Sequence, residues 1–335
     1  MSTTEPDATK EILCVSLGMV ILDEIRMPTK PPLVNIIGGS ATFVTLGLRL
    51  FAPHSRLPGC LVMAGSDFPS STRDEIRSWR MHLVIKESPD RESSRGLLTY
   101  TDDTFGPKTF SYTTPPIRPT PSDLVGTPLL RAQAFHFFGR PEEVLQQVPE
   151  LLRLRCEAHP ELAKPFIVWE PLPSACAPDA LDVFRMACGL VDVFSPNHME
   201  LAALFASDDV ASETGLLARL EIQGRCLVRN GAGTLIVRAG VDGALAMRHD
   251  EPTVHVPAFH AKGSDKVVDP TGAGNAFLGG YIAGWLREAS VKEALCYGAV
   301  ASSFAIEQIG LPASEGVSAA AGEARLAKFR RRLEM

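Results

Sequence analysis

The residues best suited to chemistry lie in one stretch late in the chain, Val267 to Phe277, which reads Val-Val-Asp-Pro-Thr-Gly-Ala-Gly-Asn-Ala-Phe. We expect a strand end, a loop of small residues and the start of a helix, because apolar residues then recur at helical spacing as far as Leu286. A Gly-Ala-Gly turn at a helix start leaves backbone N–H groups unpaired at the positive end of the helix dipole. The stretch therefore predicts an anion site, and phosphate is the usual biological anion there.

Asn275 is the first polar side chain inside this turn. A carboxylate at that position can accept a proton, whereas a neutral carboxamide is not a useful base at pH 7. The residues thus predict anion binding and leave proton transfer open. The alternative interpretation is that the Gly-Ala-Gly turn only caps a helix.

Two segments near the N-terminus are further candidates for a binding site. Ile12–Leu22 is an apolar run expected to form one buried parallel strand, with Asp23 at its carboxyl end. Because ligands bind beyond the carboxyl ends of strands in open α/β sheets, Asp23 is a candidate to bind substrate hydroxyls, and a solvated strand-end aspartate is the equal alternative. Gly38 and Gly39 precede a helix that runs to Leu50, and paired glycines allow a ligand to approach the backbone closely.

The elements that would position these residues follow a regular order. From Ala132 onward strand and helix signals alternate, which is typical of a parallel sheet with helices on both faces. Before that, a hairpin with strands at residues 96–101 and 108–113 interrupts the rhythm and is a candidate lid. We also expect strands at 134–138, 165–169, 191–194, 234–238 and 244–247, and helices at 141–154, 180–188 and 319–333.

The composition argues against several classes of protein. The chain has 335 residues, 45% apolar and 21% charged, and its net charge of −6 argues against a nucleic-acid partner. No apolar run has the length of a membrane-spanning helix, and the polar residues 1–11 are expected to form a disordered tail rather than a signal peptide. The seven cysteines are widely spaced with no Cys-x-x-Cys pair, so we expect reduced thiols and a cytoplasmic location.

The stretch around Asp269 resembles the second signature of the ribokinase-like, or PfkB, family of sugar and nucleoside kinases, which usually reads Asp-Thr-x-Gly-Ala-Gly-Asp. Four other segments are similar to family motifs and follow in family order: Gly38-Gly39, Ala64-Gly65-Ser66-Asp67, the Asn-x-x-Glu motif at 197–200, and the glycine turn at 240–243. The sequence also resembles a fungal subgroup named after a yeast killer-virus maintenance protein. The resemblance implies a three-layer α/β sandwich over residues 12–333, with a mostly parallel central sheet and a small β lid at about 24–37 and 96–114.

The resemblance also implies a set of ligands and a role for each candidate residue. The ligands are ATP, Mg²⁺ and a small-molecule substrate, and part of the family also binds a monovalent cation at the Asp269 loop. Lid strands often pair between subunits in such folds, so a homodimer is an open expectation. The residues on the substrate side would be Asp23, Gly38, Gly39 and Phe43, and those on the nucleotide side Arg238, Gly240, Gly243, Asp269 and Thr271. Asn197 and Glu200 would hold the waters of Mg²⁺. The N–H groups of Gly272, Ala273 and Gly274 would bind the transferring phosphate, and Asn275 would occupy the catalytic position.

Three departures from the family pattern bear on activity. Asn275 replaces the aspartate that serves the family as base, Phe43 stands where many members carry a substrate-binding asparagine, and Pro270 replaces the usual threonine. We therefore predict an ATP-dependent phosphotransferase that acts on a sugar, a nucleoside or an acidic acceptor, since an acceptor that is already anionic needs no base.

Two other classes of function stand against this prediction. One is a pseudokinase that binds nucleotide or a phosphorylated ligand without turnover, which Asn275 and Phe43 favour and the retained Asn197–Glu200 pair disfavours. The other is non-phosphoryl chemistry on the same fold, for which the sequence offers no separate nucleophile–base pair.

Overall fold

The computed structural model describes residues 11–53, 55–103, 108–205, 215–228 and 233–334. The predicted disordered tail at 1–11 lies outside the described residues, apart from Glu11, which begins the first strand. Part of the turn predicted between residues 102 and 107 also lies outside them. No helix in the described ranges has both the length and the apolar character needed to cross a membrane.

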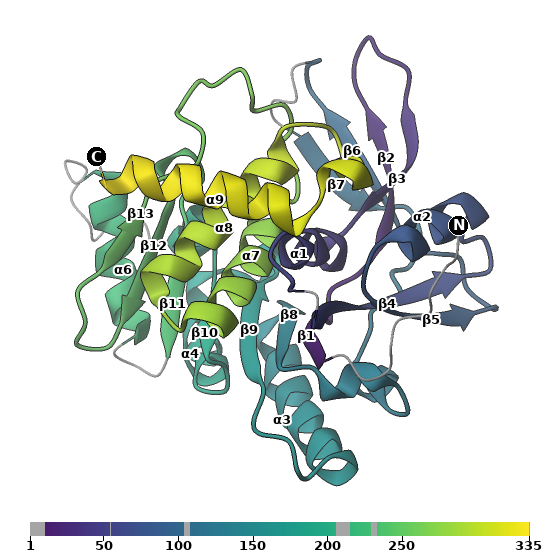
Figure 1. The fold of residues 1–335 in the computed structure, drawn as a ribbon, viewed down its shortest axis with the longest axis horizontal. Helices are drawn as coiled ribbons and strands as arrows, with labels where there is room; N and C mark the ends of the chain where they lie inside the picture. Colours follow the sequence, from purple (N-terminus) through teal and green to yellow (C-terminus); the bar gives the residue numbers. More distant parts are fainter. Residues whose placement is uncertain (1–10, 54, 104–107, 206–214, 229–232, 335) are drawn as a thin grey trace.

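A large sheet forms the centre of the molecule (Figure 1). Within the described residues it contains nine strands in the order β13-β12-β11-β10-β9-β8-β1-β4-β5. The strands from β11 to β5 pair in parallel, whereas β12 and β13 add an antiparallel edge. The strands are β1 (Glu11–Ser16), β4 (Arg56–Gly65), β5 (His82–Ser88), β8 (Ala134–Gly139), β9 (Phe166–Pro171), β10 (Val193–Phe194), β11 (Thr234–Arg238), β12 (Ala244–Arg248) and β13 (Val254–Val256).

Helices cover both faces of this sheet, because successive strand residues point to opposite faces. In β11, Ile236 packs in the core beneath α7 and α8, whereas Leu235 and Val237 pack in the opposite core. The predicted three-layer sandwich with a mostly parallel sheet is therefore confirmed. One layer contains α1 (Ser40–Arg49), α2 (Ser70–Ser78), α7 (Ala273–Glu288), α8 (Val291–Ile306) and α9 (Ala319–Glu334), and the other α3 (Pro141–Ala158), α4 (Leu181–Cys188), α5 (His198–Ala203) and α6 (Leu216–Val228).

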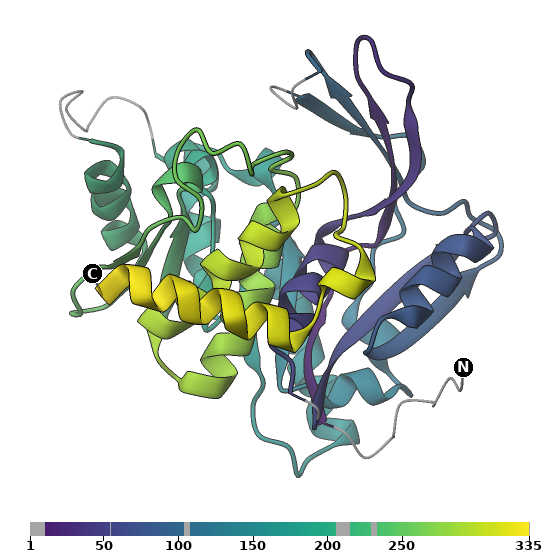
Figure 2. The ribbon, with the colours of Figure 1, turned by 45° about the horizontal axis from the view of Figure 1, so that its top comes forward.

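A second sheet, here called the small sheet, has the strand order β3-β2-β6-β7 in the described part of the chain. It consists of β2 (Ile21–Arg26), β3 (Leu33–Gly38), β6 (Arg95–Tyr100) and β7 (Lys108–Tyr112). Figures 1 and 2 show its strands extending away from the layered body, as a lid would. The predicted hairpin is thus present, and it pairs with the segment that follows β1.

The prediction of one buried strand over Ile12–Leu22 is wrong. The run divides into β1, which ends at Ser16 in the large sheet, and β2, which begins at Ile21 in the small sheet. The chain turns at Gly18, whose N–H donates to the Ser16 hydroxyl at 3.0 Å and whose missing side chain leaves room for Ser40. Both halves are apolar because both are buried, so hydrophobicity alone did not reveal the turn. Asp23 consequently lies within β2 and not at the carboxyl end of a central strand.

The prediction that Val267 and Val268 end a strand is also wrong. They form no ladder in the described residues, and the N–H of Val268 donates instead to the carbonyl of Ile306 at the end of α8, at 2.8 Å. Val267 lines a cavity described below. Val267 therefore lines the cavity from a loop, and a short apolar pair in a loop has the same composition as the end of a strand.

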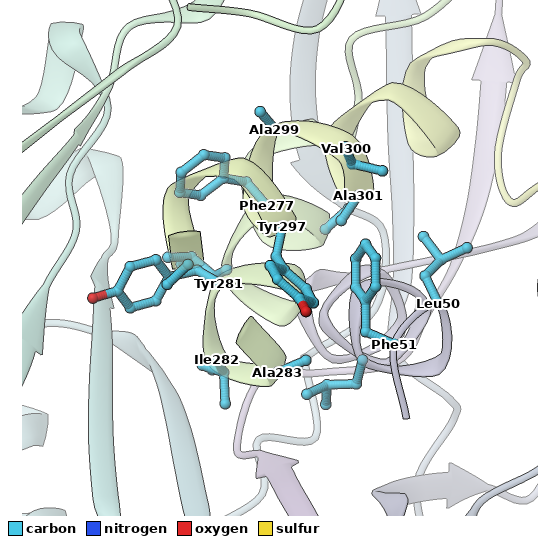
Figure 3. Packing of buried hydrophobic residues seen from close by; sticks show 14 of the residues in the cluster. Leu50, Phe51, Phe277, Tyr281, Ile282, Ala283, Tyr297, Ala299, Val300 and Ala301 are labelled. Atoms are coloured by element: carbon cyan, nitrogen blue, oxygen red, sulfur yellow. The ribbon is translucent and has the colours of Figure 1, made fainter. Parts of the chain in front are cut away.

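Glycines bring α7 close to its neighbours. A Cβ at Gly279 would lie 2.1 Å from the carbonyl oxygen of Val44 in α1, and one at Gly280 would lie 2.6 Å from the Cβ of Ala301 in α8. Figure 3 shows the buried side chains of α7 and α8 packed together beside Phe51. The start of α7 is therefore held firmly against two helices.

This packing gives a first prediction. Gly47→Ala should lower the free energy of unfolding by about 1–3 kcal/mol, the usual cost of overpacking, although alanine favours helix formation. The reason is that its Cβ would lie 2.2 Å from the backbone oxygen of Ala276 and 2.6 Å from the backbone nitrogen of Gly280, neither of which can move alone. Denaturant unfolding measures the change. Gly316→Ala, which would meet no atom within 4 Å, is the control, and equal stability of the two variants contradicts the account.

Candidate active site

Residues Gly272–Asn275 form the start of α7 and are here called the anion turn. Gly272 has a φ of 76° and precedes the first residue of the helix. The N–H of Ala273 donates to the carbonyl of Pro270 at 3.2 Å, whereas those of Gly272, Gly274 and Asn275 have no acceptor among the described residues. Three N–H groups at the positive end of a 16-residue helix thus remain available to an anion.

Phe43 of α1 supports this turn from the protein interior. A Cβ added at Gly272 would lie 2.3 Å from the Cγ of the Phe43 ring, so only glycine fits there without a shift of the ring, and the positive φ also disfavours other residues. Phe43 is buried in the core cluster of α1, α7 and α8. The structure therefore places this sequence-predicted substrate residue beneath the turn, where its ring fixes the height of Gly272.

Asn275 lies in a buried polar network that the sequence did not reveal. Its Nδ2 donates to Oε2 of Glu170, at the end of β9, over 2.5 Å. Arg238, at the end of β11, donates from Nη1 to Oε1 of Glu170 at 2.6 Å and from Nη2 to Oε2 of Glu200 at 3.3 Å. Gly274 passes so close that a Cβ there would lie 2.0 Å from Nη1 of Arg238.

The pKa values of the two carboxylates in this network are shifted in opposite directions. Burial raises the pKa of Glu200 to about 7, and repulsion from Glu170 adds to the rise, although Arg238 opposes it. Burial also disfavours ionisation of Glu170, but the attraction of Arg238 and contacts from His136 and Asn275 outweigh it, so the pKa of Glu170 falls below its usual value. Glu170 is thus the carboxylate that stays ionised beside the anion turn.

The small sheet contacts the loop that leads into the turn. The Tyr100 hydroxyl donates to Oδ1 of Asp269 at 3.0 Å, and Nζ of Lys108 lies 3.5 Å from the same oxygen. Lys108 also hydrogen-bonds the hydroxyl of Thr271. Asp269 and Thr271, predicted for the nucleotide side, therefore face β6 and β7.

Asp23 lies close to this contact and is 7% exposed. Gly38 and Gly96 flank it, and a Cβ at either would lie within 2.3 Å of its carboxylate oxygens. Its Oδ1 has no hydrogen-bond partner among the described residues. Burial raises the pKa of Asp23 to about 7; Lys108 opposes the rise and Asp269 adds to it. An unpartnered buried carboxylate of this kind is suited to accept hydrogen bonds from a ligand.

A cavity of about 360 Å³ lies beside the anion turn, and its wall is mostly apolar. It brings together Arg238, Gly240 and Gly243 with Ala273 and Gly274, as the sequence predicted, whereas Asp269 and Thr271 do not line it. Gly240 and Gly243 both have positive φ, 60° and 87°, which explains the glycines of that turn. Further lining residues are Val241, Ala258, Phe259, Val267, Phe277, Ala299 and Ile306.

Asn197 and Glu200 form the N-terminal capping box of α5. Oδ1 of Asn197 accepts from the N–H of Glu200 at 2.9 Å, and Oε2 of Glu200 accepts from the N–H of Asn197 at 2.7 Å. The described residues contain no group of three or more His, Cys, Asp or Glu that could hold a metal. The pair offers hard oxygen donors, however, and Mg²⁺ keeps several of its waters in such sites. These residues therefore fit Mg²⁺ bound through water.

Comparison with known proteins identifies the family. A family model described as pfkB family carbohydrate kinase matches residues 131–315. An uncharacterized protein of Schizosaccharomyces pombe is 33% identical over 94% of this chain and 91% of its own length, and Protein MAK32 of Saccharomyces cerevisiae is 29% identical over 92% and 88%. The chain therefore belongs to the PfkB family, and it groups with fungal members of it.

A solved structure confirms the fold independently. The aminoimidazole riboside kinase of Salmonella enterica, complexed with aminoimidazole riboside and an ATP analogue, superimposes with a TM-score of 0.66. The superposition covers 94% of this chain and 100% of the Salmonella chain, and the two sequences are 18% identical. At that identity the likeness concerns the ribokinase fold.

Four residues of the site were missed in the sequence: Tyr100, Lys108, His136 and Glu170. Glu170 carried a usable signal, because Phe166–Trp169 is a buried apolar strand and Glu170 follows it at the carboxyl edge of the sheet. His136 lies inside a strand, where an isolated histidine indicates nothing. Tyr100 and Lys108 are ordinary residues of a hairpin, and only the pairing of the small sheet brings them to Asp269.

The raised pKa of Asp23 predicts how stability depends on pH. Between its unfolded pKa near 3.8 and its folded value near 7 the native state binds the extra proton, so the free energy of unfolding falls as pH rises through this window. Asp23→Asn should remove that slope and raise the free energy of unfolding at pH 8 by about 1–3 kcal/mol. Urea unfolding at pH 5 and pH 8 tests this. Asp182→Asn, at a side chain 91% exposed, is the control, and a variant less stable than the parent at pH 8 contradicts it.

Proposed function

We propose that this protein is an ATP- and Mg²⁺-dependent phosphotransferase acting on a small molecule, either a sugar, a nucleoside or an acidic acceptor. The observation that carries the proposal is the place of the anion turn. On one side Gly274 lines the apolar cavity, and on the other the loop at Asp269 contacts Lys108, whose charge reaches Asp23. Unpaired N–H groups between a nucleotide-sized cavity and the polar residues Lys108 and Asp23 suit transfer of a phosphoryl group across the turn.

The nucleotide would lie in the cavity. Its apolar wall suits a purine, and Gly240 and Gly243 allow the backbone to approach the ring and ribose closely. The terminal phosphate would reach the N–H groups of Gly272, Gly274 and Asn275. These donors require no rearrangement during transfer, because α1 and Phe43 already fix the turn.

Mg²⁺ would neutralise the phosphate oxygens as charge develops on them. Asn197 and Glu200 would hold its waters, and Arg238 would keep Glu200 in place through the 3.3 Å contact. The proposed function involves no monovalent cation at the Asp269 loop, since the Lys108 ammonium already supplies a positive charge 3.5 Å from that carboxylate.

The acceptor would bind between Asp23 and the small sheet. The carboxylate of Asp23 would accept hydrogen bonds from hydroxyl groups, whereas Lys108 would attract an anionic group. Burial lowers the pKa of Lys108, while Asp269 and Asp23 favour its charged form. A hydroxylated acceptor that also carries a negative charge would use both residues.

The cysteines and the small sheet support two further parts of the proposal. None of the seven cysteines, all of which lie in the described ranges, forms a disulfide, which suits a reducing compartment such as the cytoplasm. Val34 of β3 and Phe110 of β7 are 59% and 47% exposed, and pairing of small sheets between two copies would cover them. We propose a homodimer of this kind as the assembly.

A pseudokinase is the second candidate, and Asn275 is the observation that favours it. Such a protein would bind ATP at the same turn without transferring its phosphate. The two candidates differ in turnover and not in binding, so an assay for phosphorylated product separates them.

The proposal predicts specific binding and turnover. Calorimetry should show that Mg²⁺ tightens ATP binding, and a panel of sugars, nucleosides and phosphorylated or carboxylated alcohols should yield a phosphorylated product that chelation with EDTA abolishes. Gly272→Ala should weaken ATP binding by about 10–100-fold, because its Cβ would strike Phe43 and displace the turn, and losing one hydrogen bond to a charged group costs about 1.5–3 kcal/mol.

The matched control is Gly126→Ala, which also has a positive φ, 74°, but would meet no atom within 4 Å. It should leave ATP binding unchanged. Tight binding of ATP and Mg²⁺ with no product from any acceptor would establish the pseudokinase instead.

A further inference from the structure

An amide and a carboxylate face each other at this site. Residue 275, where the family resemblance led us to expect a carboxylate, is an amide, and its hydrogen-bond partner Glu170 is a carboxylate. The Nδ2 of Asn275 and Oε2 of Glu170 are 2.5 Å apart. Asn275 is the third residue of α7, so Glu170 lies one hydrogen bond away from the anion turn. A negative charge is therefore retained beside the turn, on a different element.

The surroundings of Glu170 leave part of its carboxylate available. The described contacts place Arg238 on Oε1 at 2.6 Å and Asn275 on Oε2, which fills two of about four lone-pair sites. The Glu170 side chain is 5% exposed, so it is buried but retains a small contact with solvent. A hydroxyl group held at the anion turn would find an ionised acceptor there.

His136 of β8 lies behind this carboxylate. Its Nδ1 is 2.9 Å from the Ser16 hydroxyl, and its Nε2 is 3.4 Å from Oε2 of Glu170. The side chain is fully buried, and Nε2 makes no hydrogen bond of good geometry within the described residues. A buried nitrogen without a hydrogen bond needs an explanation. A change in the protonation of Glu170 during a reaction would provide one for Nε2 of His136.

We propose that Glu170 is the catalytic proton acceptor of this protein, and that Asn275 and His136 position it. The inference rests on the phosphotransferase function proposed above. The acceptor hydroxyl gives its proton to Oε2 of Glu170 while its oxygen forms a bond to the γ-phosphorus of ATP. The bond from that phosphorus to the bridging oxygen breaks, and its electron pair leaves with ADP. The proton on Glu170 then passes to solvent as product leaves.

The same geometry explains the amide at residue 275. An aspartate there would place a second carboxylate against Oε2 of Glu170, and two carboxylates at that distance cannot both ionise. The amide instead donates its N–H and keeps Glu170 charged and oriented. In this proposal Asn275 orients the base Glu170, and its amide does not mean that the protein has lost its base.

Four variants test this in the full-length protein: Glu170→Gln, Asn275→Asp, the exchange Glu170→Gln/Asn275→Asp, and the control Glu157→Gln at an exposed pair on α3. Glu170→Gln should lower kcat about 10²–10⁴-fold, the usual range for a general base. Asn275→Asp should also lower kcat, whereas a simple lost base predicts that it raises it. The exchange keeps one acid facing one amide and should recover about tenfold or more over Glu170→Gln, which corresponds to about 1.4 kcal/mol of barrier.

Calorimetry with ATP and Mg²⁺, run on every variant, separates folding and binding from chemistry. If Glu170→Gln binds ATP and turns over like the parent, the inference is overturned and the kinase proposal stands. Activity only in variants with Asp at 275 overturns the inference too, because the parent's Glu170 then does not act as base. If parent and exchange bind ATP and transfer phosphate to no acceptor, the kinase proposal itself fails and takes the inference with it.

Discussion

One guanidinium group holds the centre of this protein together. Arg238 reaches from the end of β11 to Glu170 on β9 and to Glu200 on α5, and Gly274 of α7 crosses directly against it. Two carboxylates buried this deeply would be costly without a shared cation, and removal of one partner from such a group typically costs about 3–5 kcal/mol. Four elements distant in sequence therefore meet through a single side chain, and the glycine at 274 is a consequence of it.

The anion turn depends on a second constraint, which is steric. Glycines on α1 and α7 let the two helices touch backbone to backbone, and Phe43 fills the space under Gly272. The ring of Phe43 thus packs against Gly272, and the guanidinium group of Arg238 packs against Gly274. The apolar cavity reaches the turn at Gly274, and the loop that leads into the turn contacts the small sheet near Asp23. The family membership of the chain accords with this arrangement, and the departures from the family pattern are confined to side chains around it.

The sequence predicted the features that depend on local pattern. The glycine turn and the alternation of strands and helices are both encoded within short windows. The sequence did not predict the break at Gly18, because burial in either sheet selects the same apolar residues, nor the loop at Val267, because a short apolar pair in a loop resembles a strand end. The contact of Asn275 with Glu170 joins residues 105 apart, and that of Tyr100 with Asp269 joins residues 169 apart. A single sequence carries no local signal for such distant pairs, which only the fold brings together.

The chain crosses between the body and the small sheet four times: from β1 to β2, from β3 to α1, from β5 to β6, and from β7 onward. The first two crossings are short, because the chain leaves β1 at Ser16, enters β2 at Ile21, and returns from β3 into α1 through Gly39. A change in the angle of the small sheet would be felt at these two short crossings, where Gly18 adjoins Ser40 and Gly39, at a φ of 92°, starts α1. Because α1 carries Phe43 and packs on α7, such a hinge would transmit its rotation to the floor of the anion turn. Closure of the small sheet over an acceptor would then be coupled to the alignment of the N–H groups that bind the phosphate.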